Sequence, residues 1–343
     1  MRLALHFTLS LSSLALVACG SSDASPTPDA ATPATDAGPQ RPPDPLRMRV
    51  ELPPLDCSRD NCFQVVLLSD PHVIDEWYTG PENGELDTTS ILAANERLVG
   101  ARDRIHALDM PIAHAFVLGD VIHEYNSLDP MFYYEPSNLT AHDIVASVLE
   151  TFEMPVHLAL GNHDYFVPEM PREFVHELFR DKLGLERSYY SVDHRGFRFI
   201  VLDSQLGDTW DAASARYDTT YGSFGEAQLR WLDEQLAEGL PSFVMFHHHP
   251  LVLAEDELED ADFADIHAVL GRHGNVLVAL SGHLHRWFNH QRRYGSWHVT
   301  LGSTRYDEDS FWVIRCDTES GEFDLLNPDT AVWGSVDSFP YPR

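Results

Sequence analysis

Lysine is almost missing from this chain of 343 residues, because 22 of its 23 basic residues are arginine and Lys182 is the only lysine. Acidic residues number 54, so the formal net charge is -31 at pH 7. A surface of this sign repels the phosphates of DNA and RNA, which makes a large nucleic-acid partner unfavourable. The acidity leaves two interpretations open: a preference for small or locally neutralised substrates, or a solvated surface suited to salt and solubility.

Long hydrophobic runs are also scarce, and no segment reaches the roughly 18 apolar residues that would predict a transmembrane helix. Residues 1–18 combine Arg2 with a short apolar stretch, which predicts a secretory signal peptide. The stretch ends in Leu-Val-Ala-Cys, which resembles a bacterial lipobox and implies cleavage before Cys19 and a lipid on its sulfur. Gly20 then favours the outer membrane, on its periplasmic or cell-surface face. An ordinary secretion signal with a coincidental cysteine is the alternative.

Composition divides the remainder into a tether and one domain. Residues 19–47 are rich in Ser, Thr, Pro, Ala and Asp, which cannot bury apolar surface and predict a disordered tether. Residues 48–343 are expected to form the folded domain. Cysteine is scarce, with four in the whole chain. Cys57 and Cys62 flank a short polar turn, so a local disulfide is expected in an exported protein and a metal pair is the weaker interpretation.

From residue 63 onward, short apolar strands alternate with amphipathic helices, which indicates α/β layering. Strands follow one another more directly in the second half, so mixed sheets are expected. The predicted strands are 63–69, 115–119, 156–160, 197–203, 242–247, 275–281, 297–301 and 311–316. The predicted helices are 91–108, 141–153, 171–182, 226–238 and 263–273.

Five short polar clusters follow apolar runs, so each is expected on a loop at the C-terminal end of a strand. Sheets of α/β proteins place ligands and catalytic groups at that edge. The clusters offer carboxylates, an amide and imidazoles, which are donors suited to Mn, Fe, Zn or Mg. They are Asp70-Pro71-His72, Gly119-Asp120, Gly161-Asn162-His163-Asp164, His247-His248-His249-Pro250 and Gly282-His283-Leu284-His285.

The order of these clusters resembles the calcineurin-like metallophosphoesterase superfamily, whose pattern is D-x-H, G-D, G-N-H-[DE], H and G-H-x-H. The resemblance spans about residues 63–305 and favours the branch of cyclic-nucleotide phosphodiesterases and purple acid phosphatases. It implies a four-layer αββα sandwich, with two mixed β-sheets packed face to face and helices outside. Composition alone does not select this sandwich over a doubly wound single sheet.

The same resemblance implies two divalent or trivalent metal ions, with Mn, Fe or Zn expected. Two such ions about 3.5–4 Å apart bind a shared water and clamp the phosphate, so that a bridging hydroxide attacks in line. The implied ligands of one ion are Asp70, His72, Asp120 and His285, and those of the other are Asp120, Asn162, His248 and His283.

Family members usually present the histidine ligand two residues before a proline, which selects His248 before Pro250. His247 is then expected to be a buried strand-end residue. His249 is expected either to contact a substrate phosphate or to be a solvated loop residue.

Two other histidines border the predicted ligands. By resemblance, His163 stabilises transition-state charge or protonates the leaving oxygen, and Asp164 is placed to orient it. His123 stands three residues after Asp120, where purple acid phosphatases carry a tyrosine ligand. It is expected either to contact the substrate phosphate or to cap a loop.

The sequence therefore predicts a metal-dependent phosphoesterase for small phosphate esters, with a phosphodiesterase favoured by the resemblance. A phosphomonoesterase of the acid phosphatase or nucleotidase type is the alternative. A non-catalytic binding lipoprotein is the remote alternative, although all seven implied ligands are present. The expected partners are the small substrate and, through the lipid, the outer membrane, with no protein partner.

Overall fold

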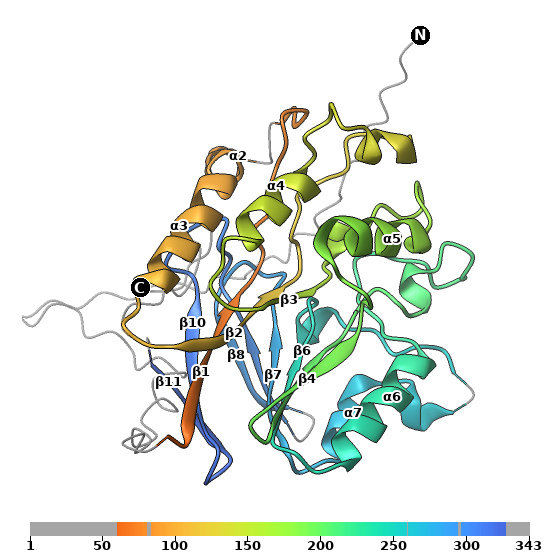
Figure 1. Cartoon of the computed structure of the whole chain (residues 1–343). Helices are drawn as coiled ribbons and strands as arrows, with labels where there is room; N and C mark the ends of the chain where they lie inside the picture. The colour runs from red at the N-terminus through yellow and green to blue at the C-terminus, as the bar shows by residue number, and fades with distance from the viewer. Residues whose placement is uncertain (1–59, 81–83, 259, 294–295, 327–343) are drawn as a thin grey trace, which may run out of the picture. The chain divides into compact units, whose positions relative to one another are not determined.

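A computed structural model of the protein describes residues 60–80, 84–258, 260–293 and 296–326, which contain two β-sheets (Figure 1). The first sheet contains β1 (Cys62–Leu68), β2 (Ile112–Leu118), β3 (Val156–Ala159), β10 (Trp312–Asp317) and β11 (Glu322–Leu325) in the order β11-β10-β1-β2-β3. The second contains β4 (Tyr190–His194), β5 (Phe197–Val201), β6 (Ser242–Met245), β7 (Val276–Ser281), β8 (Phe288–Arg293) and β9 (Ser296–Thr300) in the order β4-β5-β6-β7-β9-β8.

Both sheets are mixed. In the first, β1, β2 and β3 run parallel while β10 and β11 are antiparallel additions at one side. In the second, β5, β6, β7 and β9 run parallel while β4 and β8 pair antiparallel at the two edges. The expectation of mixed sheets is confirmed.

Helices cover the outer faces of both sheets. Those packed on the first sheet are α3 (Ala94–His106), α4 (Ala141–Leu149) and α5 (Arg172–Leu183), with the short α2 (Glu85–Leu92) just before them. Those packed on the second are α6 (Glu226–Ala237) and α7 (Ile266–Gly271). Short 3-10 turns are η1 (Pro130–Tyr134), η2 (Asn162–Asp164), η3 (Asp208–Trp210), η4 (Pro250–Val252) and η5 (Ala261–Phe263).

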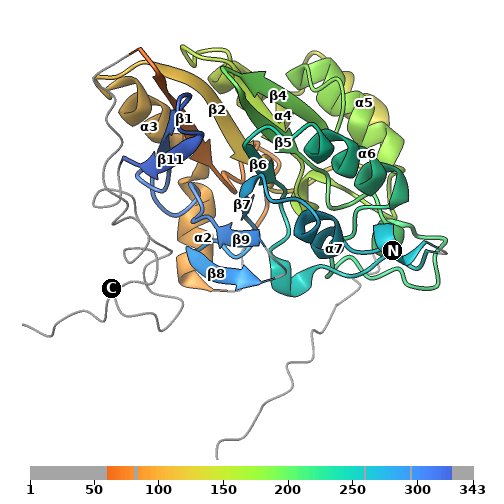
Figure 2. The same cartoon turned by 90° about the horizontal axis from the view of Figure 1, so that it is seen from below.

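The alternation of side chains along β1 shows why four layers form. Val65 and Leu67 point between the sheets, where they join a core with Phe199 of β5. Val66 and Leu68 point the other way, into the core beneath the helices. Because side chains alternate along a strand, an unbroken apolar run serves a strand that is covered on both faces. Figure 2, the view from below, shows the helices outside the two sheets. The predicted αββα sandwich is confirmed.

The differences from the predicted elements lie at edges and joints. The predicted helix 91–108 corresponds to α3, which begins at Ala94, and α2, which ends at Leu92, was not predicted. Three strands were not predicted: β4 and β8 at the edges of the second sheet and β11 at the edge of the first. Edge strands bury less surface, so their apolar signal is weaker.

Several sequence predictions fall on residues outside the described ranges. These are the signal peptide 1–18, Cys19, the tether 19–47 and Cys57. Cys62 is disulfide-bonded, and its predicted partner is Cys57. None of the helices in the described ranges is long and apolar enough to cross a membrane.

His142 on α4 is an unusual member of the core beneath the helices. Its ring packs against the rings of Tyr125, Tyr133 and Phe179, with centroids 5.2–5.9 Å away. Neither ring nitrogen has a hydrogen-bond partner in the part of the chain that the structure describes. Burial lowers the pKa of His142 from 6.5 to about 3, so the folded protein holds this imidazole neutral.

We predict that His142→Phe makes the protein less sensitive to acid. Between pH 6.5 and about 3 the unfolded chain binds a proton at His142 and the folded protein does not. Proton binding to the unfolded chain therefore lowers the free energy of unfolding as the pH falls below 6.5, and has no effect above that pH. The variant should also gain about 1–3 kcal/mol at pH 7, because an unsatisfied buried polar group is removed. Urea unfolding at pH 7.5 and pH 5 measures both effects, and equal pH dependence of the two proteins would contradict the prediction.

Candidate metal centre

The five polar clusters lie together because the strands before them end at one edge of the two sheets. In the first sheet, the Asp70 N–H donates to the Gly119 carbonyl over 3.1 Å, and the His72 N–H donates to the Asp120 carbonyl over 2.9 Å. In the second sheet, the Gly282 N–H donates to the His247 carbonyl over 2.9 Å. Backbone hydrogen bonds alone therefore join the neighbouring loops.

The backbone at the site is strained. Five residues of the clusters have φ between 49° and 74°, a region that residues with a side chain rarely adopt. Each such residue costs on the order of 1–3 kcal/mol, and such outliers concentrate at functional sites. Within the described ranges the other non-glycine residue of this kind is Arg195. The five are Asp70, His72, Asp120, His283 and His285.

Glycine allows the loops to approach closely. A Cβ on Gly119, where φ is 85°, would lie within 3 Å of the His247 ring and of the Gly161 backbone. A Cβ on Gly161 would collide with the backbone and carboxylate of Asp120. These two positions therefore require glycine for close approach of the strand ends.

One group of donors gathers around His72. Its Nε2 lies 2.9 Å from Nε2 of His285 and 3.4 Å from Oδ2 of Asp120. Nε2 of His285 lies 3.5 Å from Oδ1 of Asp70. One donor atom from each of these four residues lies within 4.8 Å of the others, and three of the four residues are buried. Donors bound about 2.0–2.2 Å from one ion stand about 3 Å apart, so this group fits a metal ion.

A second group shares Asp120 with the first. Nε2 of His247 lies 3.3 Å from Oδ2 of Asp120 and 2.9 Å from Oδ1 of Asn162. Nδ1 of His283 lies 2.8 Å from the same Asn162 oxygen and 3.3 Å from Nε2 of His247. Oδ2 of Asp120 therefore stands between two groups of donors.

The histidine that joins this second group differs from the sequence prediction. His247, and not His248, turns its Nε2 toward Asp120 and Asn162. His248 turns its Nδ1 toward the hydroxyl of Ser204 at 2.8 Å, and its Nε2 has no hydrogen-bond partner in the described ranges. The sequence predicted His248 because it stands two residues before Pro250. Three histidines follow one another here, and the first of them, His247, is the one whose ring reaches the donor group. In the structure it is therefore His247, and not His248, that contacts the donors Asp120 and Asn162.

Burial and neighbouring charges set the protonation of the site. Burial, reinforced by nearby imidazoles, holds the pKa of His72 and of His283 well below 6.5, so both rings are neutral as metal ligands must be. Burial alone would raise the pKa of Asp120, but the surrounding imidazoles of His247, His163 and His72 hold it well below 3.8. Burial opposes a charge on His247, yet Asp120 and Asp70 raise its pKa to about 9.

Asp164 does not take the role that the sequence predicted. Its Oδ1 accepts the backbone N–H groups of Val121 and Ile122 at 2.8 and 3.0 Å, and its Oδ2 accepts the Gly161 N–H at 2.7 Å. Both oxygens are thus used to join the loops after β2 and β3. The predicted orientation of His163 by Asp164 is wrong, because a buried carboxylate satisfies the nearest backbone donors.

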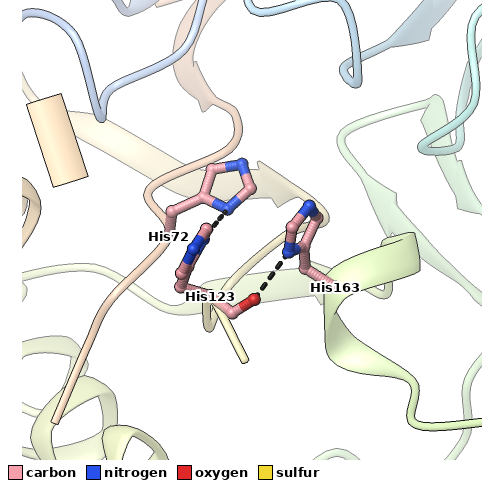
Figure 3. A group of neighbouring side chains, drawn as sticks. All are labelled: His72, His123 and His163. Carbon is pink, nitrogen blue, oxygen red and sulfur yellow. Dashed lines mark hydrogen bonds between the residues drawn. The ribbon is translucent and has the colours of Figure 1, made fainter. Parts of the chain in front are cut away.

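His163 is oriented by a backbone carbonyl instead. Its Nδ1–H donates to the His123 carbonyl at 2.5 Å, as Figure 3 shows, and its backbone N–H donates to Oδ1 of Asp120 at 2.9 Å. Because Nδ1 is occupied, Nε2 is the nitrogen left to contact a substrate oxygen. The ring of His72 lies 4.6 Å away, so His163 borders the metal ligands without joining the two groups above.

The remaining two histidines are buried rather than solvated. His249 is 5% exposed, and its Nδ1 accepts the Leu251 N–H at the start of η4 over 3.2 Å. Its proton is therefore on Nε2. His123 is also 5% exposed, and its Nδ1 lies 3.2 Å from Nδ1 of His72. Sequence reasoning missed this contact, and also that of Ser204 with His248, because no spacing along the chain indicates them.

Two mixed sheets with flanking helices, and a group of Asp and His donors at one edge of them, are typical of calcineurin-like phosphoesterases. The profile of the calcineurin-like phosphoesterase family matches residues 63–287, and the chain belongs to that family. Enzymes of this family use a dinuclear metal centre, and the Asp and His groups described here could bind metal.

Curated relatives share low identity with the chain. It is 26% identical over 153 residues to the 3′,5′-cyclic adenosine monophosphate phosphodiesterase of Escherichia coli, which is 43% of this chain and 49% of that protein. It is 23% identical over 272 residues to the manganese-dependent ADP-ribose/CDP-alcohol diphosphatase of Mus musculus, which is 65% of this chain and 72% of that protein. The chain spans about half the length of the cyclic nucleotide phosphodiesterases that it matches.

A solved structure supports the fold. A dimetal phosphatase from Danio rerio superposes with a TM-score of 0.52 at 19% sequence identity, covering 74% of this chain and 92% of that one. At this identity the likeness concerns the fold alone.

The two adjacent histidines give a direct test of the second donor group. We predict that His247→Asn lowers the metal bound per chain, because a donor beside Asp120 and Asn162 is lost. His248→Asn should retain most of its metal, since that ring faces Ser204. Elemental analysis of both purified variants after loading with Mn²⁺ measures the difference, with melting curves to show that both fold. The opposite order of metal content would restore His248 as the ligand.

Proposed function

We propose that this protein is a dinuclear phosphodiesterase that hydrolyses small phosphate esters. The observation that supports it is the position of Asp120. Its Oδ2 is 3.4 Å from Nε2 of His72 in one group and 3.3 Å from Nε2 of His247 in the other. A carboxylate can bridge two cations, whereas an imidazole nitrogen with one lone pair binds one.

The donor set fits two ions of the Mn, Fe or Zn type. When bound, such ions supply a water of lowered pKa and neutralise the charge of the phosphate oxygens. We assign one ion to Asp70, His72, Asp120 and His285, and the other to Asp120, Asn162, His247 and His283.

The protein's own residues then act on the substrate from the rim. His163 is held by the His123 carbonyl, which accepts its Nδ1–H and leaves Nε2 as the nitrogen that can serve a general acid. We place its Nε2–H at the leaving oxygen. His249 carries its proton on Nε2, and that N–H is suited to a phosphate oxygen.

The names of the relatives support a diester substrate. Those described above act on a cyclic nucleotide and on ADP-ribose or CDP-alcohols, in which each phosphorus carries at least two bridging oxygens. A phosphomonoesterase remains the second candidate, because the metal ligands alone serve both reactions.

The experiment that tests this proposal compares p-nitrophenyl phosphate with bis(p-nitrophenyl) phosphate on the Mn²⁺-loaded protein. We expect kcat/KM to be at least about tenfold higher for the diester, or about 1.4 kcal/mol in transition-state binding. Cyclic AMP and ADP-ribose then compare a cyclic phosphodiester with a diphosphate whose anhydride bond is broken.

Asp120→Asn is the matched control for that assay, because it keeps the side-chain shape and removes the bridging charge. It should lose turnover while keeping the circular dichroism spectrum of the parent. Faster hydrolysis of the monoester would favour the phosphomonoesterase. Absence of hydrolysis by a correctly loaded protein would refute the catalytic proposal.

We predict that His163→Ala lowers kcat by roughly 10²–10⁴, as loss of a general acid does, without lowering metal content. The loss should be smaller for p-nitrophenyl esters than for alkyl esters, because p-nitrophenolate leaves without protonation. The measurement is kcat on both ester types together with metal stoichiometry. Equal losses on the two esters would show that His163 stabilises charge and does not donate a proton.

A further inference from the structure

His123 lies between a predicted metal ligand and the predicted acid (Figure 3). On one side, its Nδ1 lies 3.2 Å from Nδ1 of His72. On the other side, its ring stacks on the ring of His163, with centroids 5.0 Å apart and planes 19° apart. Its carbonyl also accepts the Nδ1–H of His163. A single residue therefore contacts both histidines through separate groups.

The tautomers of these rings follow from the contacts. His72 turns Nε2 toward Asp120 and His285, so a metal-bound His72 carries its proton on Nδ1. That N–H points at Nδ1 of His123, which must then be an acceptor. His123 is accordingly the tautomer with its proton on Nε2.

The surroundings of His123 hold it in this position. Its backbone N–H donates to the Val73 carbonyl over 2.9 Å, which joins the loop after β2 to the loop after β1. The ring of Tyr78 packs edge-on against it, with centroids 5.6 Å apart. The side chain is 5% exposed. These contacts place the ring of His123 between His72 and His163 rather than in solvent.

We propose that His123 is a positioning residue that sets the tautomer of His72 and fixes the ring of His163. This inference rests on the proposed function, because it takes His72 as a metal ligand. Nδ1 of His123 affects metal affinity, because it accepts the N–H of His72. The ring face and the backbone carbonyl of His123 affect proton donation, because they contact His163. Substitutions of the His123 side chain can therefore remove the acceptor or the ring separately.

An alternative is that His123 is itself a metal ligand. His72, His123 and His163 each offer a nitrogen within 4.8 Å of the others. Against this, Nε2 of His72 is turned away, toward Asp120, and Nδ1 of His163 is occupied by a carbonyl. The stoichiometry of metal binding distinguishes the two roles.

The test uses two substitutions of His123, one that keeps the hydrogen-bond acceptor and one that keeps the ring. His123→Asn retains an acceptor near the place of Nδ1 and loses the ring, whereas His123→Phe retains the ring and loses the acceptor. Titration calorimetry of the metal-stripped full-length chain with Mn²⁺ is the readout. His142→Phe is the control, because it replaces a buried histidine whose ring contacts are with Tyr125, Tyr133 and Phe179 rather than with the donor groups.

We expect His123→Phe to weaken Mn²⁺ binding about 10–100-fold, the usual effect of losing a partner of a metal-bound histidine. His123→Asn and His142→Phe should bind Mn²⁺ nearly as the parent does. On alkyl esters, His123→Asn should lower kcat and leave KM nearly unchanged, because the ring that packs on His163 is gone. If His123→Phe does not fold, His123→Leu removes the same acceptor.

Equal Mn²⁺ affinity of all variants would overturn the proposal. So would three ions bound by the parent and two by both His123 variants, since His123 would then be a ligand. Calorimetry needs no turnover, so its result stands apart from the proposed function. A protein that binds Mn²⁺ as expected and hydrolyses no ester refutes the function and leaves the positioning role intact.

Discussion

The Asp120 carboxylate is the constraint on which the centre depends. It is buried, and in the described ranges the groups that face its Oδ2 are imidazoles rather than arginine or lysine. Moving a carboxylate out of water costs several kcal/mol unless opposite charge compensates it. His247, whose pKa is raised to about 9, compensates this charge as a cation. Two metal ions between the donors would satisfy Asp120 together with the neutral rings of His72 and His283.

The strained backbone around this carboxylate has the same origin. Left-handed φ at Asp70, His72 and Asp120 turns side chains on successive loops toward one point. Backbone bonds between those loops and the three N–H groups on Asp164 compensate for the strain. The fold thus sets the geometry in advance, and pre-organised ligands bind metal without a further entropic cost.

Simple regularities of the sequence predicted the buried strands and the edge at which the centre lies, whereas the four layers were implied by the resemblance to the calcineurin-like family. Unbroken apolar runs marked the strands covered on both faces, and the polar clusters marked where they end. Edge strands such as β4 escaped because their burial is partial. The sequence did not predict that His247 contacts Asp120, or that Asp164 accepts backbone N–H groups, for a different reason. Each depends on which of several adjacent polar groups faces a partner across the sandwich, and spacing along one strand does not contain that information.

The carboxylate of Asp75 joins the loop after β1, the loop after β2 and α4. Asp75 accepts the Trp77 N–H at 3.1 Å and the Asn126 amide at 2.8 Å through Oδ1, and the Ala141 N–H at 3.2 Å through Oδ2. The loop after β1, the loop after β2 and the start of α4 therefore meet at one buried group. His123 lies on the loop after β2, so the loop that contacts the predicted metal ligand His72 is the loop that Asp75 anchors. The contacts of Asp75 and of His123 therefore connect both loops to the donor group around His72.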